Sequence, residues 1–175
     1  MIAAVVILLA AIAACFLGLS SGSARRRRHR RRREAAKRVR ETLGKGGFKP
    51  AQALSYLRKV NPYTFEELVL DGFERDGYIV CRNDSYSGDG GKDGMVLKGG
   101  RTYLVQSKRY CRHIDRTHVE DFSRLCSREC KEGFFVHTGR TGKGSRRIAQ
   151  DAGNVTIVGG DRMLRLVGYV GSENC

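Results

Sequence analysis

The order of apolar and polar positions from residue 51 onward predicts an α/β domain. Apolar residues recur at helical spacing over 51–60 and over 61–78, and strand-like apolar runs follow. The predicted elements after these two helices are strands over 78–82, 95–97 and 102–108, a helix over 115–131, a strand over 134–138, a helix reaching residue 150, a strand over 155–158 and a helix from residue 161. This order is typical of a mixed central sheet flanked by helices.

The second predicted helix carries two adjacent glutamates, Glu66 and Glu67, which helical periodicity places on different sides of the helix. Thr64 followed by Glu67 is a capping-box signal, and Tyr63 can pack on Leu68 as a hydrophobic staple. Glu67 then belongs to the cap and points away from the apolar stripe. Glu66 falls on the flank of the stripe, where it can reach a site beside the sheet. An ordinary first-turn acid, stabilised by the helix dipole, is the open alternative for Glu66.

A β-hairpin is predicted around Gly99-Gly100, because both central positions of the favoured two-residue turn need positive φ. Facing residues then have numbers that sum to 199, so Asp93 lies opposite Gln106. Lys108 points to the same face as Gln106, since side chains alternate along a strand. The hairpin therefore predicts a carboxylate, an amide and an ammonium on one sheet face. An exposed face with a weak Lys–Asp pair is the structural alternative.

The N-terminal segment predicts a membrane anchor. Residues 2–19 contain no charged side chain, and a helix of this length spans roughly 27 Å, about the thickness of a bilayer core. A cleaved signal peptide is the alternative, but it would carry its positive charge before the apolar run. Here the arginines of 25–33 follow the run, which predicts a single pass through the inner (plasma) membrane with a cytoplasmic body. The predicted organisation is an anchor over 1–20, an Arg-rich segment with a Gly-rich linker over 21–49, and a globular domain over 50–175.

The net charge of +15 is concentrated in one stretch. Residues 25–40 hold eleven basic residues and one acid, whereas the rest of the chain is only mildly basic. Mild basicity is compatible with a polyanionic partner without requiring one. Beside an apolar span, the basic stretch favours contact with anionic lipid headgroups, and a nucleic-acid arm is the open alternative.

Three other kinds of site are not supported. The six cysteines match no usual zinc spacing, which favours reduced thiols. The loop over 139–145 is glycine-rich like a P-loop, but Lys143 precedes the second required glycine instead of following it. A calcium loop counted from Asp89 has Gly100 where its twelfth position requires a glutamate.

The loop over 139–145 still has features of a phosphate contact. Backbone N–H groups of a glycine-rich turn at a helix start can hold a phosphate. Four basic residues surround the turn and are predicted DNA-backbone contacts: Arg140, Lys143, Arg146 and Arg147. A solvated basic turn is the alternative.

Four polar residues form the candidate active site. Phosphodiester hydrolysis needs a hard cation held by carboxylates, a group that orients or deprotonates water, and a positive charge near the phosphate. Asp93 and Glu66 can ligate Mg²⁺, and Gln106 can add a neutral carbonyl oxygen. Lys108 can position the nucleophile or stabilise the charged transition state.

Four motifs, in order and at suitable distances, resemble the catalytic domain of Mrr-type restriction endonucleases, a branch of the PD-(D/E)xK nuclease superfamily. They are Phe65-Glu66-Glu67-Leu68-Val69, Gly77-Tyr78, Gly88-Asp89-Gly90-Gly91-Lys92-Asp93 and Val105-Gln106-Ser107-Lys108-Arg109-Tyr110. The stretches over 135–138 and 158–161 also resemble the C-terminal part of that family. The resemblance covers about residues 61–167.

The resemblance implies a restriction-endonuclease-like fold and a role for each residue of the candidate site. Asp93 is then the metal carboxylate, Gln106 and Lys108 are the pair of the QxK signature, and Glu66 is the helix acid. Gln106 stands where the superfamily usually has an acid, which leaves less negative charge for a second metal. Arg109, next to the QxK signature, is grouped with the predicted DNA contacts.

The implied function is Mg²⁺-dependent cleavage of double-stranded DNA by a membrane-anchored endonuclease that acts on foreign or modified DNA. The anchor stands where many family members carry a domain that reads modified bases, so the substrate preference stays open. Whether the protein forms a homodimer also stays open. Two other functions stay open. One is a catalytically silent nuclease fold that tethers DNA or a DNA-processing partner to the membrane, and the other is a structure-selective nuclease such as a junction resolvase.

Overall fold

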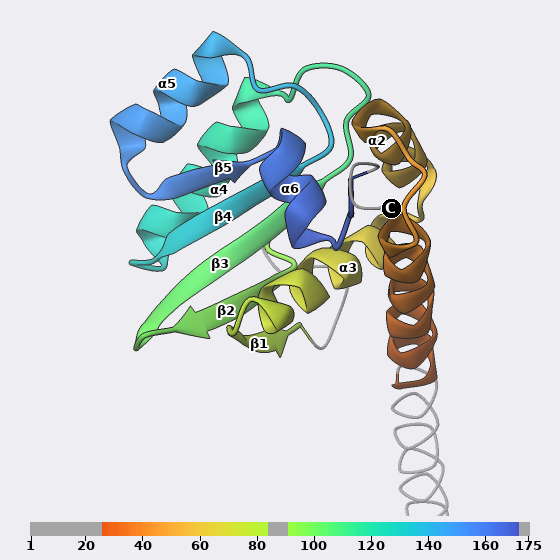
Figure 1. Ribbon diagram of the computed structural model, residues 1–175. Coiled ribbons are helices and arrows are strands. Elements are labelled where there is room, and N and C mark those ends of the chain that lie inside the picture. The colour runs from red at the N-terminus through yellow and green to blue at the C-terminus, as the bar shows by residue number, and fades with distance from the viewer. Residues whose placement is uncertain (1–25, 84–90, 172–175) are drawn as a thin grey trace, which may run out of the picture.

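The computed structural model describes residues 26–83 and 91–171, and in them a five-stranded mixed sheet has helices on both faces (Figure 1). The strands lie side by side in chain order: β1 (Ile79–Arg82), β2 (Gly94–Lys98), β3 (Arg101–Lys108), β4 (Glu132–His137) and β5 (Val155–Val158). The first three strands are antiparallel, and β4 and β5 run parallel to β3. The predicted α/β class and order of elements are confirmed.

The β2–β3 hairpin has the predicted turn and register. Gly99 and Gly100 have φ angles of 58° and 75°, which L-residues rarely adopt. Lys98 faces Arg101, and Gly94 faces Val105, as the sum of 199 requires. The local turn chemistry therefore fixes the pairing that places Asp93 across from the end of β3.

Two crossover helices cover one face of the sheet. They are α4 (Arg116–Arg128), between β3 and β4, and α5 (Lys143–Ala152), between β4 and β5. Parallel neighbours need such crossovers, because a tight turn cannot join them. Asp115 caps α4, as the sequence predicts, by accepting a hydrogen bond from the Thr117 N–H at 2.9 Å. Phe122 of α4 packs with Leu104 and Phe135 of the sheet in the core on this face.

The opposite face carries the larger core. Two helices lie on the sheet there, α3 (Pro62–Arg75) and α6 (Gly160–Leu166), and a helix over 26–44 and α2 (Pro50–Lys59) pack beside them and add residues to the same core. Val105 of β3 and Phe134 of β4 face this core, whereas their neighbours Leu104 and Phe135 face the other. The central strands are thus buried on both faces, and only their ends are available for a polar site.

The predicted N-terminus of α3 is wrong by one turn. The helix begins at Pro62, and the side chain of Asn61 caps it by accepting from the Tyr63 N–H at 3.1 Å. Proline suits the first helical position because its fixed φ is already helical and its missing N–H is not needed there. Thr64 and Glu67 therefore lie inside the helix and form no capping box, and Glu67 is only 2% exposed.

The folded body begins before Pro50, where the sequence analysis places the domain boundary. Ala36, Val39 and Leu43 of the helix over 26–44 are buried in the larger core. The predicted Gly-rich linker over 44–47 follows this helix directly, and Gly46 and Gly47 have positive φ. Part of the Arg-rich segment is therefore an element of the domain.

The predicted anchor over 2–19 lies outside the described residues. Within 26–83 and 91–171, no helix is long and apolar enough to cross a bilayer. The membrane location stays a prediction.

Candidate active site

Asp93 lies immediately before β2 and is held by the neighbouring strand. Its backbone N–H donates to the carbonyl oxygen of Val105 at 2.7 Å, one residue out of the register that pairs Val105 with Gly94, so Asp93 does not form the predicted regular pair with Gln106. Its Oδ2 accepts hydrogen bonds from the backbone N–H and from the hydroxyl of Ser107, both at 2.5 Å. The carboxylate is therefore fixed by the residue that lies between Gln106 and Lys108.

Gln106 presents an unsatisfied oxygen at the same end of the hairpin. Its Nε2 donates to the carbonyl oxygen of Gly91, at the end of the glycine-rich loop. Its Oε1 is buried and has no hydrogen-bond donor in the described part of the chain. Leaving a buried acceptor unpaired costs about 1–3 kcal/mol, so such an atom requires an explanation.

Glu66 of α3 shares an electrostatic environment with Asp93. Burial, followed by the negative charge of Asp93, raises the pKa of Glu66 from 4.5 to about 8. The positive charges of Arg32 and Lys108 act in the opposite direction. The alternative of an ordinary first-turn acid is wrong, because α3 begins at Pro62 and Glu66 lies beyond its first turn, with a half-buried side chain. Of the two adjacent glutamates, Glu66 is the one that lies beside the sheet site.

Asp93 is also a perturbed carboxyl group. Burial raises its pKa from 3.8 to about 6, although the hydrogen bonds from Ser107 and the charge of Lys108 favour the ionised form. Lys108 is the last residue of β3 and acts on both carboxyl groups. The structure therefore brings together Glu66, Asp93 and Lys108, with Gln106 on the strand that ends at Lys108.

These side chains fit a hard divalent cation. Two carboxyl groups with raised pKa values lie together, and a buried amide oxygen of Gln106 has no donor in the described residues. A bound cation would relieve the repulsion between the carboxylates and satisfy that oxygen. In residues 26–83 and 91–171, no group of three or more His, Cys, Asp or Glu side chains is arranged to hold a metal. The candidate set contains only two acids, and its third ligand is an amide.

Lys92, the residue before Asp93, is held by two side chains. Lys92 forms a 2.5 Å ion pair with Glu129 at the end of α4, and the Asn83 side chain donates to the Lys92 carbonyl oxygen at 2.8 Å. These contacts hold the backbone that leads into Asp93. Asp89 of the glycine-rich loop lies outside the described residues.

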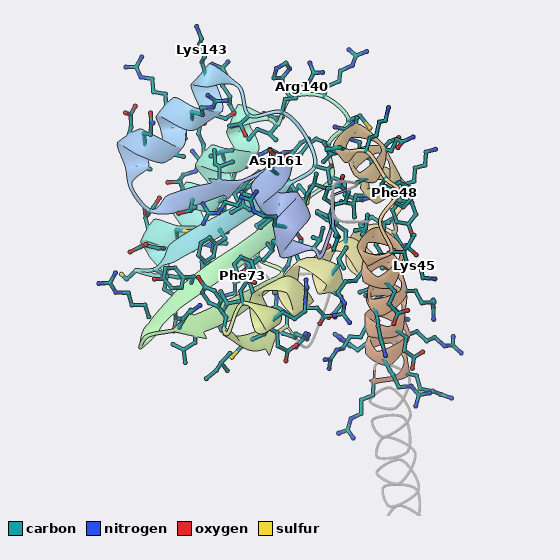
Figure 2. All side chains as sticks on the ribbon, in the orientation of Figure 1. Lys45, Phe48, Phe73, Arg140, Lys143 and Asp161 are labelled. Atoms are coloured by element: carbon teal, nitrogen blue, oxygen red, sulfur yellow. The ribbon has the colours of Figure 1, made fainter. Side chains whose placement is uncertain are left out.

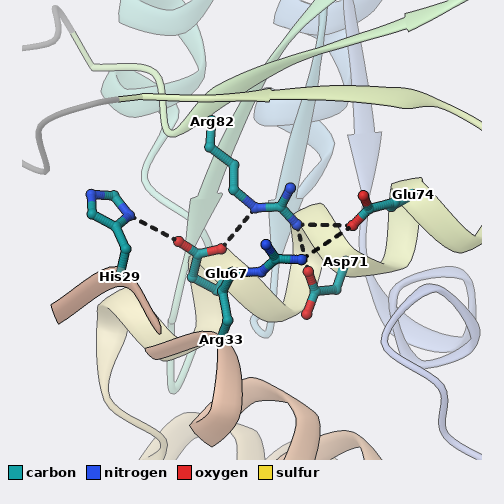
Figure 3. A network of polar contacts seen from close by, with 6 residues as sticks. All are labelled: His29, Arg33, Glu67, Asp71, Glu74 and Arg82. Carbon is teal, nitrogen blue, oxygen red and sulfur yellow. Dashed lines mark hydrogen bonds and ion pairs between the residues drawn. The ribbon is translucent and has the colours of Figure 1, made fainter. Parts of the chain in front are cut away.

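Glu67 takes part in a structural ion network behind the site (Figure 3). Arg82 of β1 donates from Nε to Glu67 at 3.0 Å, and its Nη2 contacts Asp71 at 2.5 Å and Glu74 at 3.0 Å. Nδ1 of His29 lies 3.6 Å from the other Glu67 oxygen. This network joins the helix over 26–44, α3 and β1, and it explains why a glutamate is buried there.

The predicted DNA contacts occupy two different environments. Arg109 donates to the carbonyl oxygens of Arg58 and Val60 at the end of α2, so its guanidinium ties α2 to the end of β3. The other four residues are exposed at the loop after β4 and along α5: Arg140, Lys143, Arg146 and Arg147. Figure 2 shows Arg140 and Lys143 projecting from this part of the surface. Arg147 also pairs with Asp151 at 3.4 Å.

The basic turn after β4 is organised by a buried histidine. His137 accepts a hydrogen bond from the Gly139 N–H at 3.1 Å, and its Nε2 lies 3.0 Å from the Thr141 hydroxyl. Burial lowers the pKa of His137 to about 4, so the ring is neutral at pH 7. His137 is paired with Lys108 in the sheet register, which places this turn at the same end of the sheet as the candidate active site.

Sequence reasoning missed Ser107, Arg32 and the role of His137. Ser107 is the middle residue of the QxK signature. Because side chains alternate along a strand, Ser107 is predicted on the face opposite Gln106 and Lys108, so the sequence did not indicate that it would bind Asp93. Arg32 lay in a segment assigned to the membrane surface. Its place beside Glu66 depends on the packing of the helix over 26–44, which is a tertiary effect.

The fold combines a β-hairpin with the parallel strands that follow it, and the site places carboxylates beside a lysine. Together these features are typical of restriction-endonuclease-like nucleases. The chain belongs to the Mrr-type catalytic domain family, described as restriction endonuclease, whose model matches residues 57–167. This match confirms the resemblance seen in the motifs and assigns the domain to the nuclease class of enzymes.

Two known proteins are similar to the chain over part of their length. The type IV methyl-directed restriction enzyme EcoKMrr of Escherichia coli strain K12 is 30% identical over an alignment of 142 residues, which covers 77% of this chain and 45% of that protein. The MspJI restriction endonuclease, solved in complex with a 27-mer oligonucleotide, matches with a TM-score of 0.54 and 21% identity over 67% of this chain and 30% of that one. The second match shows the fold. The chain spans less than half the length of either protein.

Proposed function

We propose that this protein is a Mg²⁺-dependent endonuclease that hydrolyses phosphodiester bonds of double-stranded DNA. The observation that carries the proposal is the convergence of Glu66, Asp93 and Lys108 beside Gln106, whose buried oxygen lacks a donor in the described residues. Membership of a restriction endonuclease family supports the same reaction class. The solved relative is a complex with an oligonucleotide, which supports DNA as the partner.

The side chains divide the chemistry between metal ligation and phosphate contact. Asp93, Glu66 and Gln106 would hold Mg²⁺, which when bound supplies a positive charge that polarises the phosphodiester and favours deprotonation of water. Ser107 keeps the Asp93 carboxylate turned toward the site through two hydrogen bonds. Lys108 places an ammonium beside both carboxyl groups, where it can donate to a phosphate oxygen as negative charge develops.

Foreign or modified DNA is the proposed substrate. The relative from Escherichia coli is described as methyl-directed, and that description belongs to a protein more than twice as long as the aligned region. Methylated and unmethylated DNA therefore both belong in the test. A homodimer would place a second active site on the other strand, so double-strand breaks and nicks are to be scored separately.

The direct test uses the full-length protein in a neutral detergent with supercoiled plasmid, methylated or unmethylated, in Mg²⁺ or in EDTA. We expect Mg²⁺-dependent cleavage by the wild type and loss of cleavage in Asp93→Asn and Lys108→Ala. Glu132→Gln is the matched control, because this exposed acid starts β4 at the end of the sheet away from Lys108. The control is expected to cleave like the wild type.

The alternatives predict different results in the same assay. DNA that is bound but never cut by the wild type would support the silent tether. Cleavage confined to four-way junctions would support the structure-selective nuclease. A wild type that neither binds nor cuts DNA would refute the proposed function.

We further propose that residues 2–19 anchor the protein in the inner membrane with the domain in the cytoplasm. The uncharged apolar run followed by arginines supports this topology. Full-length protein should remain in the membrane pellet after alkaline carbonate extraction, and a C-terminal tag should resist protease in intact spheroplasts. Release into the supernatant, or digestion of the tag from outside, would refute the anchor or its orientation.

A further inference from the structure

The helix over 26–44 lies outside the part of the chain that matches the restriction endonuclease family, yet it packs on the domain. The family match begins at residue 57. Ala36 and Leu43 are fully buried in the larger core, and Val39 is 8% exposed. The arginines one to two turns earlier on this helix are therefore held at a defined place on the protein.

Three contacts fix the arginine-bearing turns against α3. His29 lies 3.6 Å from Glu67, and Arg33 lies 3.9 Å from Glu74. Figure 3 shows both residues reaching from the helix toward the acids of α3. The guanidinium of Arg32 lies 3.9 Å from the centre of the Tyr63 ring, in a cation–π contact.

The Arg32 contact places one flank of the helix beside the candidate active site. Tyr63 and Glu66 are three residues apart on α3, so they are neighbours on its surface. The charge of Arg32 is close enough to Glu66 to offset part of the rise in the pKa of that carboxyl group. Arg28 lies one turn before Arg32 on the same side of the helix, and Arg31 lies farther round that side. We call Arg28, Arg31 and Arg32 the site flank.

The opposite flank has different surroundings. Arg33 faces Glu74, and at 100° per residue Arg26 and Arg30 fall on the side beyond Arg33. Arg30 pairs with Glu34 at 3.5 Å, so acids partly compensate this flank. On the site flank, neither Arg28 nor Arg31 has an acidic partner among the described residues, and both are exposed. Two of the three arginines on the opposite flank are paired with acids, and Arg26 has no such partner in the described part of the chain, so more of the uncompensated positive charge lies on the side of the helix that adjoins Glu66.

We propose that Arg28, Arg31 and Arg32 bind the phosphate backbone of duplex DNA and hold it beside the Asp93 site. This inference rests on the proposed function because it takes DNA as the substrate. Guanidinium groups suit phosphate oxygens, and contacts of this kind set the position of a duplex without reading its sequence. A lipid surface is the competing partner for the same charges. A bilayer lying against this flank would cover the candidate site, whereas a duplex lying there would reach it.

The test compares two double variants of the full-length protein in a neutral detergent. Arg28→Gln/Arg31→Gln neutralises the site flank, and Arg26→Gln/Arg30→Gln removes the same charge from the opposite flank. Affinity for a fluorescent 30-base-pair duplex is measured by anisotropy in EDTA over a range of salt concentrations, so the result does not depend on cleavage. After removal of detergent, flotation with vesicles of neutral phosphatidylcholine is compared with flotation with vesicles containing anionic phosphatidylglycerol, so that insertion of residues 2–19, common to both vesicle types, cancels and the difference reports lipid binding by the arginines.

The site-flank variant should bind the duplex at least tenfold more weakly at 0.1 M salt, and its salt slope should fall by about 1.8, since each phosphate contact contributes about 0.9. The opposite-flank variant should change affinity less than threefold. Equal effects of the two variants, or none, would overturn the proposal. Loss of anionic-vesicle binding with unchanged DNA affinity would overturn it in favour of lipid.

Cleavage of plasmid by the wild type separates this inference from the proposed function. If the wild type cuts DNA and the site-flank variant binds and cuts equally well, the inference fails and the endonuclease stands. If the wild type binds DNA through the site flank without cutting, the inference stands and the endonuclease fails. If the wild type does not bind DNA, both fail.

Discussion

Ser107 is the residue that most directly fixes the geometry of Asp93. Its hydroxyl and its backbone N–H both donate to Asp93 Oδ2 at 2.5 Å. Ser107→Ala removes one of the two donors and leaves the backbone unchanged. Residues that orient a metal ligand typically contribute about 10- to 100-fold to metal affinity or activity. We therefore expect a loss of that size in the Mg²⁺-dependent cleavage rate, measured as a function of Mg²⁺ concentration.

Ser123→Ala is a suitable control for the loss of a buried hydroxyl. Ser123 lies on α4, where its Oγ donates to Asn154 Oδ1 at 2.9 Å, away from the candidate ligands. This variant should unfold at a slightly lower temperature but keep the Mg²⁺ dependence of the wild type. Equal shifts of the Mg²⁺ response in both variants would show that Ser107 acts on stability alone.

The raised pKa of Glu66 makes a prediction about stability without metal. Burial and the charge of Asp93 raise this pKa from 4.5 to about 8, so between these values the folded state binds more protons than the unfolded state. The free energy of unfolding therefore falls as pH rises from about 4.5 to about 8. The contribution of Glu66 to the free energy of unfolding is fully present below pH 4.5 and is lost above about pH 8.

Urea unfolding in EDTA across this pH range tests the prediction. The wild type should lose stability as pH rises, and Glu66→Gln should reduce that loss because its amide does not titrate. Glu132→Gln, which changes an exposed acid, should behave like the wild type. A Glu66→Gln protein with the same pH dependence as the wild type would contradict the assignment of the raised pKa to this residue.

The two adjacent glutamates show what residue patterns can and cannot predict. Helical periodicity predicts Glu66 on the flank of the apolar stripe of α3, and in the structure Glu66 is half-buried and close enough to Asp93 for their charges to interact. The prediction for Glu67 was wrong, because the helix is capped by Asn61, followed by Pro62, and not by Thr64. Its burial depends on Arg82, which is distant in sequence and reaches it only after β1 has packed.

Among the elements, the hairpin was predictable because its determinants are local. Gly99 and Gly100 set the turn, and the turn sets the pairing of every residue up to Gly94. The helix over 26–44 was misassigned because its arginines dominate the composition. Ala36, Val39 and Leu43 are spaced three and four residues apart, which is the apolar stripe of a packed helix. That stripe was the available signal for a domain boundary earlier than Pro50.

The packing of this helix can be tested through Leu43, which is fully buried. Leu43→Ala should lower the free energy of unfolding by about 2–5 kcal/mol, because it removes apolar contacts and leaves a cavity. Lys37→Ala on the exposed side of the same helix should change it by less than about 1 kcal/mol, since its pair with Glu41 at 4.0 Å is solvent-exposed. Urea unfolding followed by circular dichroism measures both. Equal small effects would mean that the helix contributes little to the folded body.

At the scale of the whole molecule, the candidate chemistry lies at one end of the sheet. Asp93 precedes β2, Lys108 ends β3, and the basic turn follows the end of β4. Antiparallel and parallel pairing together bring these three chain positions to the same end. The helix over 26–44 adds arginines near this end from outside the family domain. The site flank and the basic turn after β4 can therefore hold a phosphate backbone beside a metal at the candidate ligands without any rearrangement of the core.

This arrangement predicts that Mg²⁺ stabilises the whole protein. Without metal, Asp93 and Glu66 repel each other and the Gln106 oxygen lacks a donor in the described residues, so cation binding to the folded state relieves both. A ligand at a hundred times its Kd stabilises a protein by about 2.7 kcal/mol, which is about 5–11 °C in Tm at this size. The full-length wild type and Glu132→Gln should show this rise on Mg²⁺ titration in neutral detergent. Asp93→Asn should not, because it loses the anionic ligand. An equal rise in Asp93→Asn would place the stabilising Mg²⁺ at another part of the protein and would refute the proposed metal ligands.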